Sequence, residues 1–255
     1  MSPSVKMDFD GRVAIVTGGT RGIGRVIAER LAMAGCKVVV CGRSEPESLP
    51  DGVSFIAADV READQAAGLV EKVLTEFGQL DILVNNAGGS PQAEAANASP
   101  RFFDAILKLN LHSAMYMAQA AFAPMKAAGG GSVVNIASVS GIRPSPGTAA
   151  YGAAKAGLLN LTQSLAQEWG PDGVRVNAII AGLMQTDTTE STYGDDVAQQ
   201  AVAQSLPLQR MGRGADIANA VMWLCSDMAA WVSGARINVD GGGEKPLFLD
   251  LVKEK

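Results

Sequence analysis

The chain has 255 residues, of which 47% are hydrophobic and 18% are charged, and its formal net charge is −5. This composition excludes a disordered protein, and the acidic balance argues against a protein that wraps nucleic acid, which needs a basic face. Cys36, Cys41 and Cys225 form no C-x-x-C pair. Because an odd number of cysteines does not suit a disulfide framework, we expect buried thiols in a reducing cytoplasm.

No apolar run reaches the roughly 18 residues of a membrane-spanning helix, and the N-terminal segment does not resemble a signal peptide. We therefore expect a soluble, cytoplasmic protein without a membrane partner. No spacing of side chains typical of a metal site is present either.

Apolar runs and helical patterns alternate along the whole chain. Short runs rich in Val and Ile predict seven strands, at Arg12–Thr17, Lys37–Cys41, Val53–Ala57, Leu80–Val84, Ser132–Ala137, Val174–Ile179 and Arg236–Val239. Helical periodicity follows the first strand and recurs at Arg61–Phe77, Phe102–Met125, Tyr151–Trp169 and Asp216–Cys225. Strands that alternate with helices require crossover connections, so we expect an α/β fold with a doubly wound parallel sheet and helices on both faces.

Two segments, Gly88–Pro100 and Leu183–Pro207, are too irregular for this scheme. Both follow strands, so both should lie at the carboxyl edge of the sheet, where such folds bind ligands. In the second segment, Met184, Thr188 and Tyr193 are candidates for a lid over the ligand.

A glycine-rich turn, TGGTRGIG at Thr17–Gly24, links the first strand to the first helix. Gly18 permits a tight turn, Gly22 lets the backbone approach a pyrophosphate, and Gly24 allows close helix packing. The helix N-terminus offers free N–H groups to phosphates. The turn therefore predicts a dinucleotide site in a Rossmann-type domain, with an ordinary glycine turn as the alternative. The other predicted contacts in this turn are Thr20, Arg21 and Ile23.

The residues after the second strand select the dinucleotide. An NAD enzyme usually has a carboxylate there, whereas this chain has Cys41-Gly42-Arg43-Ser44. Arg43, helped by Arg21, could hold a 2′-phosphate, so NADP(H) is expected in preference to NAD(H). The alternative is that both arginines are merely solvated. Further predicted cofactor contacts follow the third and fourth strands, at Asp59, Val60, Asn86, Ala87 and Gly88.

Ser138, Tyr151 and Lys155 form a candidate catalytic group. Tyr151 and Lys155 are four residues apart and so share one helix face, while Ser138 ends the fifth strand. A tyrosine can protonate the oxygen of a reduced carbonyl, and a nearby ammonium should lower its pKa from about 10. Ser138 can polarise the carbonyl oxygen, and Lys155 could also hold a ribose. Alone, the pair would more often be a chance occurrence on a surface helix.

Over nearly its whole length the chain resembles the short-chain dehydrogenase/reductase family. The resemblance rests on the Thr17–Gly24 turn, Asp59, NNAG at Asn85–Gly88, Asn110, Ser138, Tyr151, Lys155, Arg175–Asn177 and Asp240–Gly242. It implies that Asn110 supports a proton relay beside the three catalytic residues, that Tyr151, Lys155, Gly182 and Thr186 contact the cofactor, and that the protein is a homotetramer or homodimer. Ala181 stands where the family usually has proline, which should loosen the turn that follows.

We expect one domain over residues 1–255, with residues 11–110 mainly binding the cofactor, 111–242 carrying catalytic and substrate loops, and 243–255 forming a tail. The expected activity is interconversion of a ketone and a secondary alcohol, and among family members the 3-oxoacyl-[acyl-carrier-protein] reductases are similar in length and layout. The alternatives are a steroid, polyol or other secondary alcohol dehydrogenase and a non-catalytic dinucleotide sensor. An acidic carrier would need basic residues around the entrance, for which the candidates are Arg101, Lys108, Lys126 and Arg143.

Overall fold

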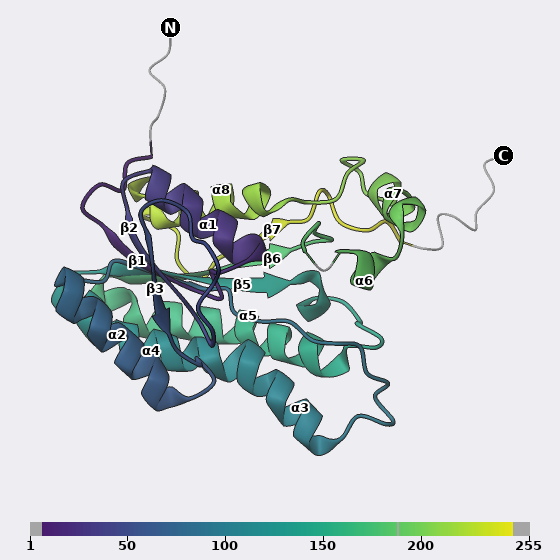
Figure 1. The fold of residues 1–255 in the computed structure, drawn as a ribbon, viewed down its shortest axis with the longest axis horizontal. Coiled ribbons are helices and arrows are strands. Elements are labelled where there is room, and N and C mark those ends of the chain that lie inside the picture. Colours follow the sequence, from purple (N-terminus) through teal and green to yellow (C-terminus); the bar gives the residue numbers. More distant parts are fainter. Residues whose placement is uncertain (1–6, 188, 247–255) are drawn as a thin grey trace, which may run out of the picture.

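The computed structural model describes residues 7–187 and 189–246. A seven-stranded parallel sheet in the order β3-β2-β1-β4-β5-β6-β7 runs through the middle of the molecule (Figure 1). Its strands are β1 (Val13–Thr17), β2 (Lys37–Gly42), β3 (Val53–Ala57), β4 (Ile82–Asn85), β5 (Gly131–Ser138), β6 (Val174–Ala181) and β7 (Arg236–Val239). This arrangement confirms the predicted doubly wound, Rossmann-type α/β fold.

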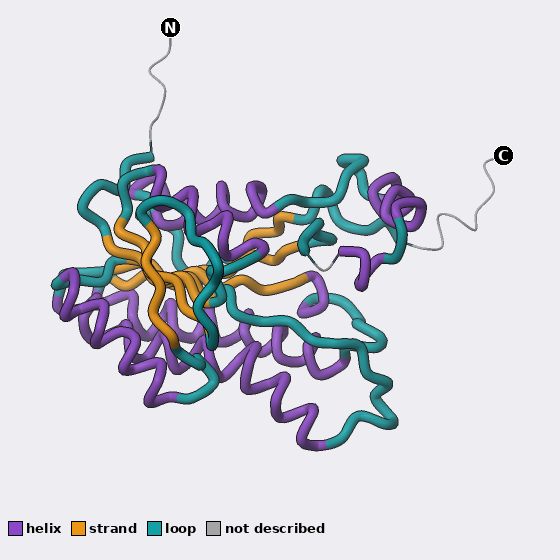
Figure 2. The backbone as a smooth tube through the Cα atoms, viewed as in Figure 1, coloured by secondary structure: helices purple, strands orange, loops and turns teal. Residues whose placement is uncertain are grey.

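Helices cover both faces of the sheet (Figure 2). On one face α1 (Gly22–Met33) packs against α8 (Gly214–Cys225), and on the other lie α2 (Ala63–Phe77), α4 (Ser113–Ala127) and α5 (Ala149–Trp169). Short 3-10 turns complete these connections at Val139–Gly141, Gly170–Asp172 and Asp227–Ala229. Among the described helices, none combines the length and apolar character that crossing a membrane requires.

The inner strands are largely apolar on both sides because both sides are buried, whereas the edge strands β3 and β7 contain no buried residue. In β1, Val13 and Ile15 belong to the core under α2, α4 and α5, whereas Ala14 and Val16 belong to the core under α1 and α8. Successive side chains of a strand point to opposite faces, so a continuous apolar run is what a covered parallel strand needs.

The predicted helix Phe102–Met125 is in fact a continuous helical segment of three parts. It begins with α3 (Pro100–Leu107), where the Ser99 side chain accepts a hydrogen bond from Phe102 N. A π-helical turn at Lys108–His112 then connects α3 to α4. The periodicity of the sequence indicated a helix, but it carried no sign of the wider turn, which places Asn110 in its middle.

One of the two irregular segments contains unexpected helices. Gly88–Pro100 has no helix or strand before α3 begins at Pro100, as predicted. Leu183–Pro207, in contrast, includes α6 (Thr189–Tyr193) and α7 (Asp196–Ser205), and the carboxylate of Asp195 caps α7 by accepting from Ala198 N. None of the ten residues of α7 is buried, so its sequence lacked the apolar stripe that predicts a helix. Thr188 and tail residues 247–255 lie outside the described residues.

Candidate active site

The glycine turn is as tightly packed as the sequence analysis expected. Gly18 and Gly22 have φ angles of 62° and 55°, a region that residues with a Cβ rarely adopt. A Cβ on Gly24 would lie 2.4 Å from Asn86 Nδ2 and 2.5 Å from Gly18 O. Gly19, which the sequence analysis did not single out, is equally restricted, because its Cβ would lie 2.4 Å from Val40 Cγ1.

The turn is fixed to the end of β4 by Thr17, whose role the sequence analysis missed. The buried Thr17 hydroxyl accepts hydrogen bonds from Asn86 N and Ala87 N, both at 3.0 Å. The Asn86 side chain in turn donates to Thr17 O at 2.9 Å and Gly18 O at 3.2 Å. Asn86, predicted as a cofactor contact, therefore uses its side-chain amide to hold the turn.

The N-terminus of α1 has the properties of an anion site. Its first turn contains no acidic residue, and the N–H of Gly22 donates to Oδ2 of Asp187 at 3.2 Å. A Cβ on Gly22 would meet only this Asp187 oxygen, at 4.0 Å, so the backbone is open there. Since helix N-termini favour phosphates, the glycine cradle fits a dinucleotide pyrophosphate. Asp187 gave no signal in the sequence because nothing linked it to a turn 165 residues away.

The predicted selectivity residues lie around the ends of β2 and β3. Arg21 and Arg43 are both exposed. The residues before them, Thr20 and Gly42, approach closely, because a Cβ on Gly42 would lie 3.5 Å from Thr20 Cγ2.

Asp59, at the end of β3, is held by Arg61, whose Nε lies 2.9 Å from its Oδ1 and whose Nη2 lies 2.5 Å from its Oδ2. The Arg61 hydrogen bonds, and more weakly the Arg43 charge, keep the Asp59 pKa below its usual value. The Asp59 carboxylate thus has a protein partner that the sequence analysis did not expect, while the predicted contact Val60 is buried beside it.

The loop that follows β4 contacts two other predicted site residues: its Gly88 lies against Asn110 and Lys155. A Cβ on Gly88 would lie 2.7 Å from Asn110 Oδ1 and 3.2 Å from Lys155 Nζ. Asn110 is buried, accepts from Gly89 N at 2.8 Å, and donates to Gly89 O and Ile106 O, both at 2.9 Å. The π-helical turn therefore supports the β4 loop, in agreement with the tendency of such turns to occur at functional sites.

Ser138, Tyr151 and Lys155 are brought together at the carboxyl end of β5. The Ser138 hydroxyl accepts from Ser140 N at 3.2 Å and hydrogen-bonds the Tyr151 side chain. Lys155 is buried, donates from Nζ to Ile136 O at 2.8 Å, and lies 5.5 Å from the centroid of the Tyr151 ring.

The direction of the Tyr151 pKa differs from the expectation. Burial raises the Tyr151 pKa, which the Ser138 hydrogen bond lowers only in part and the neighbouring Tyr193 raises further. Burial also lowers the pKa of Lys155 to about 8. The predicted lowering of the Tyr151 pKa is therefore wrong in direction, because burial dominates the shift and the Lys155 ammonium donates to a backbone carbonyl instead.

Ala181, which stands where the family usually has proline, is the last residue of β6 and has a regular strand position. It pairs with Ser138 of β5 on one side and with Val239 of β7 on the other. Gly182 follows and packs tightly, since its Cβ would lie 2.5 Å from Asp240 Cα. Thr186 then lies between these strands and α6, where its backbone N–H donates to Thr189 Oγ1 at 2.6 Å.

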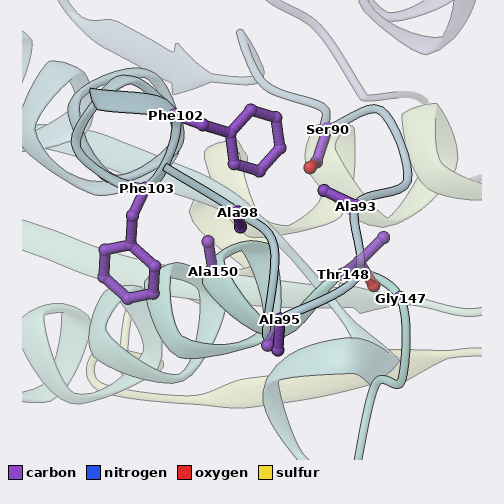
Figure 3. A pocket seen from close by; sticks show the side chains of 10 residues that line it. Ser90, Ala93, Ala95, Ala98, Phe102, Phe103, Gly147, Thr148 and Ala150 are labelled. Atoms are coloured by element: carbon purple, nitrogen blue, oxygen red, sulfur yellow. The ribbon is translucent and has the colours of Figure 1, made fainter. Parts of the chain in front are cut away.

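A small cavity of about 100 Å³ lies between the β4–α3 loop and the start of α5 (Figure 3). Backbone atoms join its two sides, with Ala93 N donating to Gly147 O at 2.8 Å. Phe102 and Ser90 face each other across it, and Ala98 and Ala150 complete much of the apolar wall. The cavity belongs to the same carboxyl edge as Tyr151.

Three of the four basic residues considered for carrier recognition form ion pairs with carboxylates of the chain. Lys126 pairs with Asp172 at 2.9 Å near the amino ends of β5 and β6, away from the site, so its assignment to the entrance is wrong. Lys108 pairs with Glu62 at 2.8 Å, and Arg143 pairs with Glu244. Within residues 7–187 and 189–246, no group of three or more His, Cys, Asp or Glu side chains could hold a metal ion.

Comparisons with known proteins agree with this geometry. The family model described as enoyl-(acyl carrier protein) reductase matches residues 18–244. The chain is 36% identical over 242 residues to the 3-oxoacyl-[acyl-carrier-protein] reductase FabG of Escherichia coli, covering 92% of this chain and 98% of that one. It is 37% identical over 246 residues to the 3alpha-hydroxysteroid dehydrogenase of Mediterraneibacter gnavus, again covering 92% and 98%.

Among solved structures, levodione reductase superimposes with a TM-score of 0.86 at 32% identity, covering 92% of this chain and 98% of the other. The matched region includes the glycine turn, the π-helical turn and the Ser138–Tyr151–Lys155 group described above. The chain therefore belongs to the short-chain dehydrogenase/reductase family and is an oxidoreductase that acts on CH–OH and C=O groups.

Proposed function

We propose that this protein is an NADP(H)-dependent enzyme that interconverts a ketone and a secondary alcohol, with Tyr151 as the proton donor and acceptor. The observation that carries the proposal is the convergence of Ser138, Tyr151 and Lys155 at the carboxyl end of β5, at the same edge as a glycine cradle that fits a pyrophosphate. When bound, the nicotinamide supplies or accepts the hydride.

Side chains of the protein bind the carbonyl oxygen, transfer the proton and hold the site in place. Ser138 holds the carbonyl oxygen, and the Tyr151 hydroxyl delivers a proton to that oxygen during reduction or removes it during oxidation. Lys155, fixed by its hydrogen bond to Ile136 O, lies beside the Tyr151 ring, where its ammonium would hold a ribose hydroxyl of the bound cofactor. Asn110, through its bonds to Gly89, keeps the β4 loop in place next to Lys155.

The preference for NADP(H) rests on Arg43 and Arg21. The turn after β2 offers an exposed guanidinium in the place of a carboxylate, and guanidinium forks match phosphate geometry. Replacing Arg43 by Ala should lower the affinity for NADPH by about tenfold and leave the affinity for NADH unchanged, as expected for the loss of one charge-assisted contact. Fluorescence titration of both nucleotides measures this, and an unchanged NADPH-to-NADH ratio would remove the basis of the assignment.

The proposal names only the class of the substrate, a ketone or secondary alcohol. Two relatives of nearly equal sequence identity are named for different substrates, so each substrate is tested. A 3-oxoacyl thioester is the first substrate to test, because of the similarity to FabG. A cyclic ketone or steroid is the second, because of the similarity to a hydroxysteroid dehydrogenase. NADPH oxidation with acetoacetyl thioesters and with cyclic ketones separates these classes, and turnover of neither class despite NADPH binding would instead support a dinucleotide sensor.

On the basis of the family resemblance, we also propose that the protein is a homotetramer or homodimer in the cytoplasm. Light scattering on the purified protein measures the subunit number directly.

A further inference from the structure

Three segments that are distant in sequence meet beside Tyr151: the β5–α5 loop, helix α6 and the residues after β7. Arg143 of the loop and Glu244 of the last segment form an ion pair, with Nη2 donating to Oε1 at 3.0 Å and Nε in contact with Oε2. Both side chains are 38% exposed. The pair thus places two opposite, solvent-exposed charges at the carboxyl edge of the sheet.

Tyr193 of α6 connects this ion pair to the catalytic tyrosine. Burial raises the Tyr193 pKa most strongly, but Glu244 raises it further and Arg143 lowers it, so both charges lie within electrostatic reach of its hydroxyl. Tyr193 also contributes to raising the pKa of Tyr151. The Arg143–Glu244 pair therefore lies within electrostatic range of Tyr193, and Tyr193 lies within electrostatic range of Tyr151.

The two partners are not equally fixed. The backbone of Arg143 donates to Val139 O at 3.1 Å, and its Nη1 donates to Pro144 O at 3.1 Å. The same loop is pressed against α5, since a Cβ on Gly141 would lie 2.8 Å from the backbone carbon of Lys155.

Glu244 instead follows Gly241, Gly242 and Gly243, whose φ angles of 68°, 97° and 75° are all positive. Because three successive glycines have the widest backbone freedom available, Glu244 is the partner that can move away.

We propose that Arg143 binds an anionic group, a carboxylate, on the part of the substrate remote from its carbonyl, and that Glu244 holds this position in the free enzyme. The exchange costs little, because the guanidinium keeps one carboxylate partner throughout and the displaced Glu244 moves into water. This inference rests on the proposed function and narrows its substrate class to oxo acids or the matching hydroxy acids.

The test compares ketones that differ only in charge. A series of methyl ketones with a terminal carboxylate, from levulinate upward in chain length, is assayed with NADPH beside the methyl ester of each acid. We expect the wild-type enzyme to prefer the acid to its ester at the best chain length. Arg143→Gln should lower kcat/KM for that acid by about 10–100-fold, the loss expected for a bidentate charged contact, and change kcat/KM for the ester by less than about twofold.

Glu244→Gln provides the opposite prediction. It breaks the same ion pair but frees Arg143, so kcat/KM for the acid should rise by about two- to fivefold, because the competing carboxylate is gone. Lys126→Gln, which breaks the ion pair with Asp172 at the far edge, should change neither substrate. Thermal unfolding of all variants checks that each is folded.

Equal use of acid and ester at every chain length by the wild-type enzyme would overturn the inference. So would an equal loss for both substrates in Arg143→Gln, which would show a structural role, or a loss for the acid in Glu244→Gln. These results leave ketone reduction intact, whereas failure of the proposed function would appear as no NADPH oxidation with acids, esters, thioesters or cyclic ketones.

Discussion

The carboxyl edge of the sheet has two parts that are built in different ways. The first edge is formed by the residues that follow β1, β4 and β5, and the second edge by those that follow β6 and β7. At the first, buried side chains satisfy backbone groups at short range in space, as Thr17 does for Asn86 and Ala87 and as Asn110 does for Gly89. At the second, exposed charges join distant segments, as Asp187 does with Gly22 and Glu244 with Arg143, and α7 buries none of its residues.

This difference indicates that the first edge is rigid and that the second edge can adapt to a ligand. Buried polar contacts are expensive to break because the freed groups find no water, so the first edge keeps one geometry. Exposed ion pairs contribute little to stability, so the contacts of the second edge can be exchanged for contacts to ligands. Tyr151 lies where the two edges meet, between Ser138 and Tyr193.

Removing the Tyr151 hydroxyl should have the largest effect. Tyr151→Phe keeps the ring over Lys155 but removes the group that transfers the proton, so kcat should fall by about 10²–10⁴-fold, as for loss of a general acid. The affinity for NADPH, measured by fluorescence titration, should remain within about threefold, because the rigid edge is intact. Retention of full activity in this variant would refute the role of Tyr151.

Thr17→Val should show how rigid the first edge is. The substitution leaves the N–H groups of Asn86 and Ala87 without their buried acceptor, so the free energy of unfolding should fall by about 2–4 kcal/mol. Thr75→Val is the matched control, because the exposed Thr75 hydroxyl only donates to Glu71 O within α2, and its effect should stay below about 0.5 kcal/mol. Urea denaturation measures both, and equal losses would contradict the comparison.

The raised pKa of Tyr151 predicts opposite pH responses in the two directions of the reaction. Burial raises the pKa above its ordinary value of 10.0, so the neutral hydroxyl predominates near pH 7. Reduction needs this acid form and should be nearly independent of pH up to that pKa. Oxidation needs the phenolate, so its kcat/KM should rise about tenfold per pH unit below the pKa. Initial rates over a pH series in both directions give the answer, and a flat oxidation profile would contradict it.

Asp187→Asn should produce the smallest effect and reports on the second edge. The carboxylate accepts from Gly22 N where a pyrophosphate is expected, so the charge competes with the cofactor. Its removal should tighten NADPH binding by about two- to fivefold, the range for an exposed electrostatic contact. Asp196→Asn, which removes the same charge from α7, should leave the dissociation constant unchanged, and a weaker NADPH affinity in Asp187→Asn would show that Asp187 assists binding.

The sequence was sufficient for the parts of the molecule that depend on local pattern. The seven strands were predicted because each is a short apolar run. Gly18, Gly24 and Ser138 were identified by their position relative to a strand end, and Tyr151 and Lys155 by their four-residue spacing on one helix face. Their roles in binding and catalysis stay predictions, but the structure does bring Ser138, Tyr151 and Lys155 together.

What the sequence could not reveal depends on distance and burial. The contact between Asp187 and Gly22 spans 165 residues, and no periodic feature signals it. The direction of the Tyr151 pKa could not be predicted either, because it depends on how deeply the fold buries the Tyr151 side chain. Helix α7 escaped prediction because a helix that buries nothing has no apolar stripe.

The π-helical turn at Lys108–His112 makes the length of this helix as important as its composition. An i→i+5 hydrogen-bond pattern accommodates one more residue than an α-helical turn. A single deletion in this turn would leave a regular α-helix with α3 and α4 in nearly the same relative rotation, and only the wider turn that presents Asn110 would be lost. Asn110 would then leave Gly89, so the segment should accept many replacements but no change in residue number.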